Sequence, residues 1–470
     1  MSRPRRARSL LLALGLAAAV GVPAVARAQM TDAPASYAGD LWSRPRLTGD
    51  WWESRDWLLK RGVTLDLDLT QVLQGVGTGG RQTGVGYDGL VNYELDFDTG
   101  KMGLWPGGFL KIKAFTGYGN NEDKDSGALL PVNMLALLPQ PDDNNATGLM
   151  NLTFTQFLTK WFGLYAGKVY ALGGDDNAFA HNYNTQFLNT ALNFNATLGY
   201  APWTAYGGGL VVLPWEGAVV TAAVLDPNGT ATNNDISQAF SDGVLVNAEG
   251  RVTIKPFGLV GHQDLGFLWS NKTHASLDQG PSNIVRGLLF EQFPRLANPG
   301  RILQRIIARF FPELLVPVQP LNEKSSTWSV YYNFDQYLWS PQGDPNRGVG
   351  LFFRFGASDG NPNPVKYAYN VGVSVNGMLP GRPKDTLGVG WARTQFSSEF
   401  VPFLRQKLDL GLNVENAVEM YYNAAITPWF NLALDLQVVD SALNKTLNSN
   451  NQLVTMGTAV VGGLRAYLRF

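Results

Sequence analysis

Hydrophobic and polar residues alternate closely along several segments of the chain. From Val63 to Thr70, valine and leucine occupy every second position, and threonine and aspartate occupy the positions between them. Residues 91–98, 188–198 and 431–438 repeat this pattern with few interruptions. Successive side chains of a β-strand point to opposite faces, so each segment predicts a strand with one apolar and one polar face.

Two of the alternating regions are longer than the strands of soluble β-sandwiches. A sandwich strand has about five or six residues, whereas a tilted membrane strand needs about 9 to 11. Residues 185–200 and 416–438 reach the longer length. The second region is interrupted at Thr427-Pro428-Trp429, which predicts a short turn with an aromatic residue at a membrane boundary. These lengths favour membrane strands.

The last residues alternate in the same way and end on Phe470, with Arg465, Tyr467 and Arg469 on the polar face. This ending resembles the closing strand of bacterial outer-membrane barrels. In a barrel the apolar faces meet lipid, and the polar faces meet a watery lumen where Asp66 and Asp68 cost little. The pattern therefore predicts an all-β fold, a transmembrane antiparallel β-barrel.

Residues 1–28 have the three parts of a secretory signal. A cluster of arginines precedes an apolar stretch from Ser9 to Val20, and Ala26-Arg27-Ala28 forms a cleavage site. We therefore expect a cleaved signal peptide over residues 1–28, an N-terminal segment on the periplasmic side over 29–62, and the barrel over 63–470.

The N-terminal segment contains the pattern of a short helix. Asp50 and Glu53 have the spacing of a capping box, and Gly62 is suited to end the helix. A second helix is predicted near residues 300–316, where Arg301, Arg305 and Arg309 recur among apolar residues. Whether this loop helix lies on a membrane surface, plugs the pore or covers the barrel mouth stays open.

Composition narrows the function classes. The chain has no cysteine, which excludes disulfides, cysteine catalysis and thiolate metal sites. Its formal net charge of −1 becomes mildly more negative once the arginines of residues 1–28 are removed, too weak a charge to imply nucleic acid as a partner. The 52 glycines and 12% aromatic residues suit many strands joined by tight turns.

Two motifs suggest hydrolases and fail on context. Gly356 to Gly360 matches G-x-S-x-G around Ser358, but every histidine lies upstream, and the prolines that follow cannot start the required helix. His274 and Ser276 would share one strand face, as in barrel phospholipases, but the asparagine-glycine pair of those enzymes is missing. We expect no enzyme, no metal site and no cofactor, with a phospholipase as a distant alternative.

Four motifs together resemble the carbohydrate-selective porin family often called OprB. They are Leu47 to Trp51 with Arg61 to Val63, Tyr331 to Tyr337, Gly350 to Gly356 with Ser358 to Pro364, and Pro380 to Thr386. The resemblance implies a barrel of about 16 antiparallel strands that lets small carbohydrates diffuse through the outer membrane of a Gram-negative bacterium. Outer-membrane lipid is then a partner, and the oligomeric state, monomer or trimer, stays open.

Alternation also predicts which polar side chains face the lumen. Both charge signs appear among them, as sugar hydroxyls require, whereas an ion-selective pore would show one sign. A general or anion-preferring porin is the alternative. The residues expected to line the pore or bind its substrate are Tyr331, Asn333, Asp335, Arg354, Glu415, Glu419, Tyr421, Asp66 and Asp68.

Overall fold

The computed structural model describes residues 33–121, 123–141, 144–171, 176–280, 320–341, 347–402, 409–447 and 453–470, together with residues 283, 304–305, 308–309, 344 and 405–406. The predicted signal peptide lies outside the described residues. The predicted loop helix near 300–316 also lies outside them, apart from residues 304–305 and 308–309.

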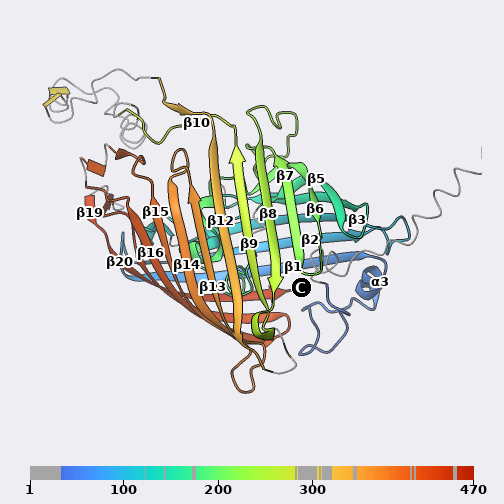
Figure 1. Cartoon of the computed structure of the whole chain (residues 1–470). Helices are drawn as coiled ribbons and strands as arrows, with labels where there is room; N and C mark the ends of the chain where they lie inside the picture. The colour runs from blue at the N-terminus through green and yellow to red at the C-terminus, as the bar shows by residue number, and fades with distance from the viewer. Residues whose placement is uncertain are drawn as a thin grey trace, which may run out of the picture.

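The described chain forms a closed barrel of antiparallel strands (Figure 1). In order around the barrel, its sixteen strands are β1 (Val63–Gly80), β2 (Gly84–Asp98), β3 (Gly108–Asn120), β4 (Thr147–Phe157), β5 (Phe162–Tyr170), β6 (Thr204–Val212), β7 (Ala218–Leu225), β8 (Leu245–Ile254), β9 (Gly261–Ser270), β12 (Thr327–Trp339), β13 (Gly348–Ser358), β14 (Val365–Asn376), β15 (Thr386–Phe396), β16 (Val414–Thr427), β17 (Phe430–Asp440) and β20 (Gly457–Arg469).

The predicted closing strand is confirmed, because β20 pairs with both β17 and β1. Leu468 lies opposite Leu69 on β1 and opposite Phe430 on β17. The predicted turn at residues 427–429 is confirmed as well, since Thr427 pairs with Phe430 across it. Closure pairs the backbone of every barrel strand on both sides, as a membrane barrel requires.

The strands expose their apolar residues and bury their polar ones, the reverse of the pattern in a soluble protein. On β17, Leu434 is 60% exposed and Leu436 is 45% exposed, whereas Asp435 is buried and Gln437 is fully buried. On β1, Leu65 and Leu73 are exposed, whereas Thr64 and Thr70 are buried. The apolar face thus points outward, where a membrane supplies lipid, and the polar face points into the barrel.

Short helices and two small hairpins lie in the connections. They are α3 (Ser54–Lys60), α4 (Asp123–Ser126), η2 (Met134–Leu137), α5 (Thr190–Asn193), η4 (Ala196–Leu198) and η5 (Pro256–Gly258), with the pairs β10 (His274–Ala275) and β11 (Glu323–Lys324), and β18 (Lys445–Leu447) and β19 (Leu453–Thr455). None of the helices in the described residues is long and apolar enough to cross a membrane.

The N-terminal helix exists but begins later than predicted. Trp51, Trp52 and Glu53 have positive φ angles, so α3 starts at Ser54 and the predicted capping box is wrong. Asp50 still contributes, because its carboxylate accepts a hydrogen bond of 2.7 Å from the amide of Asp56 in the first turn.

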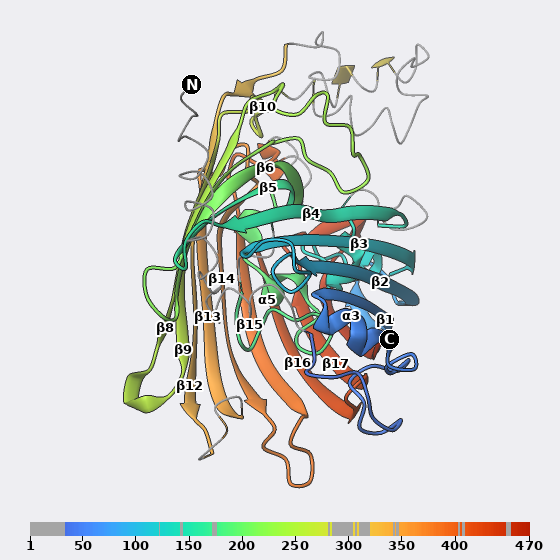
Figure 2. The same cartoon turned by 90° about the vertical axis from the view of Figure 1, so that its right-hand side faces the viewer.

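The barrel has one end that carries the long connections, which we call the long-loop end, and an opposite short-turn end. Two connections at the long-loop end fold back into the barrel. We call residues 123–141, between β3 and β4, the first inner segment, and residues 176–203, between β5 and β6, the second inner segment. Figure 2 shows α5 of the second segment inside the ring of strands. The prediction of a membrane strand over residues 185–200 is therefore wrong.

The alternation within the second inner segment has a different cause. Leu188 and Leu192 are fully buried, but Asn189 and Asn195 between and after them are buried too. The asparagine side chains cap the two short helices, since Asn189 accepts from the amide of Ala191 and Asn195 from that of Thr197. In this segment, polar and apolar side chains alike pack against other interior residues. Neither set faces lipid or open water.

Candidate functional site

The barrel interior has two halves of different character. In the filled half, the inner faces of β12–β17 are covered by the two inner segments. In the open half, a cavity of about 700 Å³ is bounded by residues of β1–β3, β5–β8 and β20, with contributions from the second inner segment and from Arg46. The long connections lie at the extracellular end of such barrels and the short turns at the periplasmic end, so the inner segments enter from outside.

Two glutamates of β16 hold the inner segments in the filled half. Glu419 is fully buried and accepts hydrogen bonds from the amides of Leu188, at 2.5 Å, and Asn189, at 2.9 Å. Glu415 does the same for the first inner segment, through the amides of Leu129, at 2.7 Å, and Leu130, at 2.9 Å. The carboxyl oxygens of both glutamates accept hydrogen bonds from amides that would otherwise be buried unpaired.

Strands β12 and β13 hold the second inner segment from the other side. Arg354 is 1% exposed and donates to the carbonyl of Leu192 at 3.0 Å. Asp335, equally buried, accepts from the amide of Ala178 at 3.0 Å, and its second oxygen lies 2.7 Å from Nδ1 of His262.

The remaining predicted residues of the filled half are also enclosed. Asn333 accepts a hydrogen bond of 2.7 Å from the side chain of Asn177. Tyr421 packs edge-on against Phe187, with 4.8 Å between the ring centroids. Tyr331 is 3% exposed, and its hydroxyl donates to Glu249 at the border of the open half.

These seven residues face inward, as the alternation predicts, but they do not line the large cavity. Their partners lie far away in sequence, on segments that alternation alone places elsewhere. In the described structure, Asn333, Asp335, Arg354, Glu415, Glu419 and Tyr421 contact the inner segments, and Tyr331 donates to Glu249 on β8. That these seven residues line the pore or bind its substrate stays a prediction.

The other two predicted residues, Asp66 and Asp68, do line the cavity. Asp66 forms ion pairs with Arg46, at 2.6 Å, and Arg55, at 3.0 Å, both from the N-terminal segment. Asp68 accepts a long hydrogen bond from Asn92 at 3.4 Å and lies 4.0 Å from Arg469.

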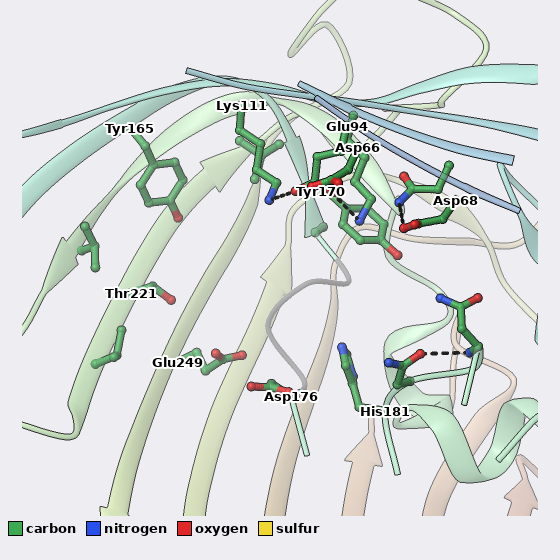
Figure 3. Close-up of a pocket in the computed structure, with 18 of the residues that line it drawn as sticks. Asp66, Asp68, Glu94, Lys111, Tyr165, Tyr170, Asp176, His181, Thr221 and Glu249 are labelled. Carbon is green, nitrogen blue, oxygen red and sulfur yellow. Dashed lines mark hydrogen bonds and ion pairs between the residues drawn. The ribbon is translucent and has the colours of Figure 1, made fainter. Parts of the chain in front are cut away.

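The charged lining of the cavity contains both signs in equal number. Figure 3 shows Asp66, Glu94 and Lys111 along one side, and Glu249 and Asp176 along the other. The lining includes five cationic and five anionic side chains: Arg46, Lys111, Lys113, Arg251 and Arg469, and Asp66, Asp68, Glu94, Asp176 and Glu249. Tyr165, Tyr170 and Tyr467 add hydroxyls and aromatic rings.

Several of these charges are paired along the wall. Glu94 on β2 pairs with Lys111 and, at 3.4 Å, with Lys113, both on β3. Alternation also identifies these lysines as inward-facing, since Leu110, Ile112 and Ala114 occupy the other face of β3; our sequence analysis did not include them. Arg46 carried no such signal, because it lies outside the strands.

The second inner segment and β8 meet at the border of the two halves. There Arg251 pairs with Asp176, and His181 lines the same cavity. Partial burial opposes ionisation of Asp176, but the nearby positive charge of Arg251 outweighs it and holds the pKa of Asp176 below its ordinary value.

The hydrolase motifs take part in loop structure. The hydroxyl of Ser358 donates to the carbonyl of Val365 at 2.7 Å. Ser276 accepts from the amide group of Asn361 at 2.8 Å, and Nδ1 of His274 lies 3.0 Å from the hydroxyl of Tyr200. Both serines are thus engaged in holding connections between strands.

Comparisons with known proteins agree with this architecture. A model of the family described as carbohydrate-selective porin, OprB family, matches residues 82–470. Porin B of Pseudomonas aeruginosa is 29% identical over 119 residues, which cover 22% of this chain and 26% of Porin B. The matched region thus spans about a quarter of that relative's length.

Two solved structures share the fold. The high-pH structure of Pseudomonas putida OprB has a TM-score of 0.73 and 19% identity, covering 92% of this chain and 100% of that one. The low-pH structure of the same protein has a TM-score of 0.53 and 15% identity, covering 91% and 99%.

Proposed function

The chain belongs to the carbohydrate-selective porin family, OprB, and we propose that it lets small neutral sugars diffuse through the open half of its barrel. The family and the fold place it in the outer membrane of a Gram-negative bacterium, and porins of this kind are channels rather than enzymes. The sugar would pass between the paired charges of β1–β3 and those of β8.

The balanced charge of the cavity is the observation that carries this proposal. A pore that selects ions presents rings of one sign, whereas the cavity presents five charges of each sign and three tyrosines. A sugar needs hydrogen-bond donors and acceptors on all sides, together with apolar surface for its ring faces. Carboxylates, ammonium groups and tyrosines supply both.

Pairing of the charges also suits release of the sugar. Glu94 is engaged with Lys111 and Lys113, so a sugar hydroxyl that approaches it must share an acceptor already in use. The net gain of each hydrogen bond is then small, because one partner is exchanged for another. Weak, quickly reversible binding follows, as facilitated diffusion requires.

Liposome swelling combined with bilayer recording tests the proposal. We expect proteoliposomes to swell rapidly in monosaccharides, and sugar to reduce the ion current through single channels. We also expect a reversal potential near zero in a salt gradient, because the two charge signs balance. Strong anion selectivity without any block by sugars would support a general anion-preferring porin and contradict the proposal.

A further inference from the structure

A second cavity, of about 240 Å³, adjoins the first one at the short-turn end of β1–β5. Lys111, Tyr165 and Val169 line both cavities, so the two share a boundary. Gly62 and Lys101 also contribute, and they lie just before β1 and just after β2. Material leaving the large cavity toward the periplasm has this smaller space directly beside its path.

The small cavity contains a buried carboxylate with an unused oxygen. Asp96 on β2 is 6% exposed, and its Oδ1 atom accepts no hydrogen bond from any described residue. Nζ of Lys111 is 4.0 Å from that oxygen, too far for a hydrogen bond but close enough to offset its charge. A buried acceptor of this kind requires a partner, and the cavity beside it is the space from which one can come.

The remaining lining suits a sugar ring. Thr155 of β4 provides a hydroxyl, and Phe109 and Tyr165 provide aromatic surface. The side chains of Asn151 and Thr153 also line the cavity but are hydrogen-bonded within the wall. The hydroxyl of Thr155 forms no hydrogen bond within the described residues and is therefore available. Its volume of about 240 Å³ provides room for a single monosaccharide ring.

Tyr165 is held in place between the two cavities by the glycine opposite it. Gly209 pairs with Tyr165 across β5 and β6, and a Cβ atom at Gly209 would lie only 2.7 Å from Cζ and Oη of the tyrosine. The absence of a side chain at Gly209 thus lets the ring lie flat against the wall. In Figure 3 its hydroxyl points into the large cavity, near the side of Lys111.

From this geometry we propose that the small cavity is a second, exit-side binding site for one neutral monosaccharide ring, with Asp96 as its principal hydrogen-bond acceptor. The inference rests on the proposed sugar-diffusion function. It adds the position of a second binding site and the order in which a sugar meets the two cavities. A sugar passes from the charged cavity across Tyr165, gives up its contacts in that cavity, and binds Asp96 and Thr155 before it leaves.

Sugar block of ion current, with glucose added to one side of the bilayer at a time, tests the second site. Glucose entering from the short-turn end meets the site first. In Asp96→Asn the half-blocking concentration from that side is expected to rise about tenfold, because an amide NH₂ group that cannot accept a hydrogen bond replaces one carboxyl oxygen. From the long-loop end the value is expected to change little. Thr155→Val, which removes a hydroxyl without altering shape, should shift the same side in the same direction by a smaller factor.

A matched control removes a negative charge at the same end without touching either cavity. Glu216 lies in the exposed turn between β6 and β7 and lines neither space, so Glu216→Gln should leave both half-blocking concentrations unchanged. Unblocked single-channel conductance serves as the test of correct folding for each variant.

The outcomes separate the two proposals. Side-specific loss of block in both Asp96→Asn and Thr155→Val supports the second site. If glucose blocks the wild-type channel and Thr155→Val and a conducting Asp96→Asn are blocked equally well from the short-turn end, the second site is refuted while the sugar-porin function stands. If glucose neither blocks nor crosses the wild-type channel, the proposed function itself fails, and the second site with it.

Discussion

Asp335 on β12 and Asp68 on β1 both point into the barrel, yet their surroundings differ completely. Asp335 is 1% exposed and binds the amide of Ala178 in the second inner segment, whereas Asp68 borders a cavity of about 700 Å³. The same alternation therefore produces a structural anchor in the filled half and a channel wall in the open half. What separates them is the course of the second inner segment, which covers Asp335 and does not cover Asp68.

The largest effect is expected from breaking the main anchor of the filled half. Glu419→Ala leaves the buried amides of Leu188 and Asn189 without their hydrogen-bond acceptor, at a cost of about 3 kcal/mol. The second inner segment should loosen, so single-channel conductance should rise severalfold and discrimination between mono- and disaccharides should fall. Planar-bilayer recording and liposome swelling measure the two quantities. Conductance equal to wild type would show that Glu419 is not needed to hold the segment.

The two aspartates give a matched pair of smaller substitutions. Asp335→Asn should lower the free energy of unfolding by about 1 to 3 kcal/mol, because it weakens buried hydrogen bonds to Ala178 and His262, with little change in ion selectivity. Asp68→Asn should do the opposite: an unchanged stability, and a reversal potential shifted toward anions. Denaturant unfolding in detergent and reversal potentials decide the matter. Equal selectivity shifts in both variants would contradict the expectation that Asp68 lines the channel and Asp335 does not.

This contrast also explains what the sequence could and could not predict. Val63 to Thr70 correctly predicted a membrane strand, its inward face and two cavity residues, because its apolar face points outward and its polar face points into the barrel. Residues 185–200 show a similar alternation but form an inner segment, because apolar packing against other interior residues produces the same pattern as contact with lipid. Alternation records which face is apolar, and it does not record what lies against that face.

The candidate site shows the same limit at single residues. The alternation of side chains along the strands correctly predicted that Glu419 and Arg354 face inward. Their partners, Leu188 and Leu192, lie more than a hundred positions away in sequence. Arg46 could not be found at all by this reasoning, since no strand period assigns it a direction. Contacts between distant segments decide which inward residues meet a solute.

Arg46 offers a test of how the open half keeps its charge balance. It is 2% exposed, pairs with Asp66 and belongs to the N-terminal segment, which also contacts the C-terminus through Arg55 and the carbonyl of Phe470 at 3.0 Å. Arg46→Gln removes one of the five cations, so permeability for potassium over chloride should rise by about fivefold, the effect of one unit charge at close range in water.

The double variant Arg46→Gln with Asp66→Asn removes one charge of each sign and serves as the control. Its reversal potential should return close to that of wild type. A single variant that keeps the wild-type selectivity would mean that Arg46 only fastens the N-terminal segment and does not act on passing ions.

The smallest expected effect concerns acid, at the border between the two halves. Arg251 keeps the pKa of Asp176 below its ordinary value despite partial burial, so their ion pair stabilises the folded border at neutral pH. An acid whose pKa is lowered by folding contributes stability above its unfolded value, near about 3.9, and loses it as the pH falls through the folded value. The free energies of unfolding of wild type and Arg251→Gln should therefore differ by a constant amount above about pH 5 and converge as the pH falls through the lowered pKa of Asp176. A difference that persists in acid would assign the role of Arg251 to its packing, since the charge on Asp176 would then be irrelevant to how the second inner segment is held against β8.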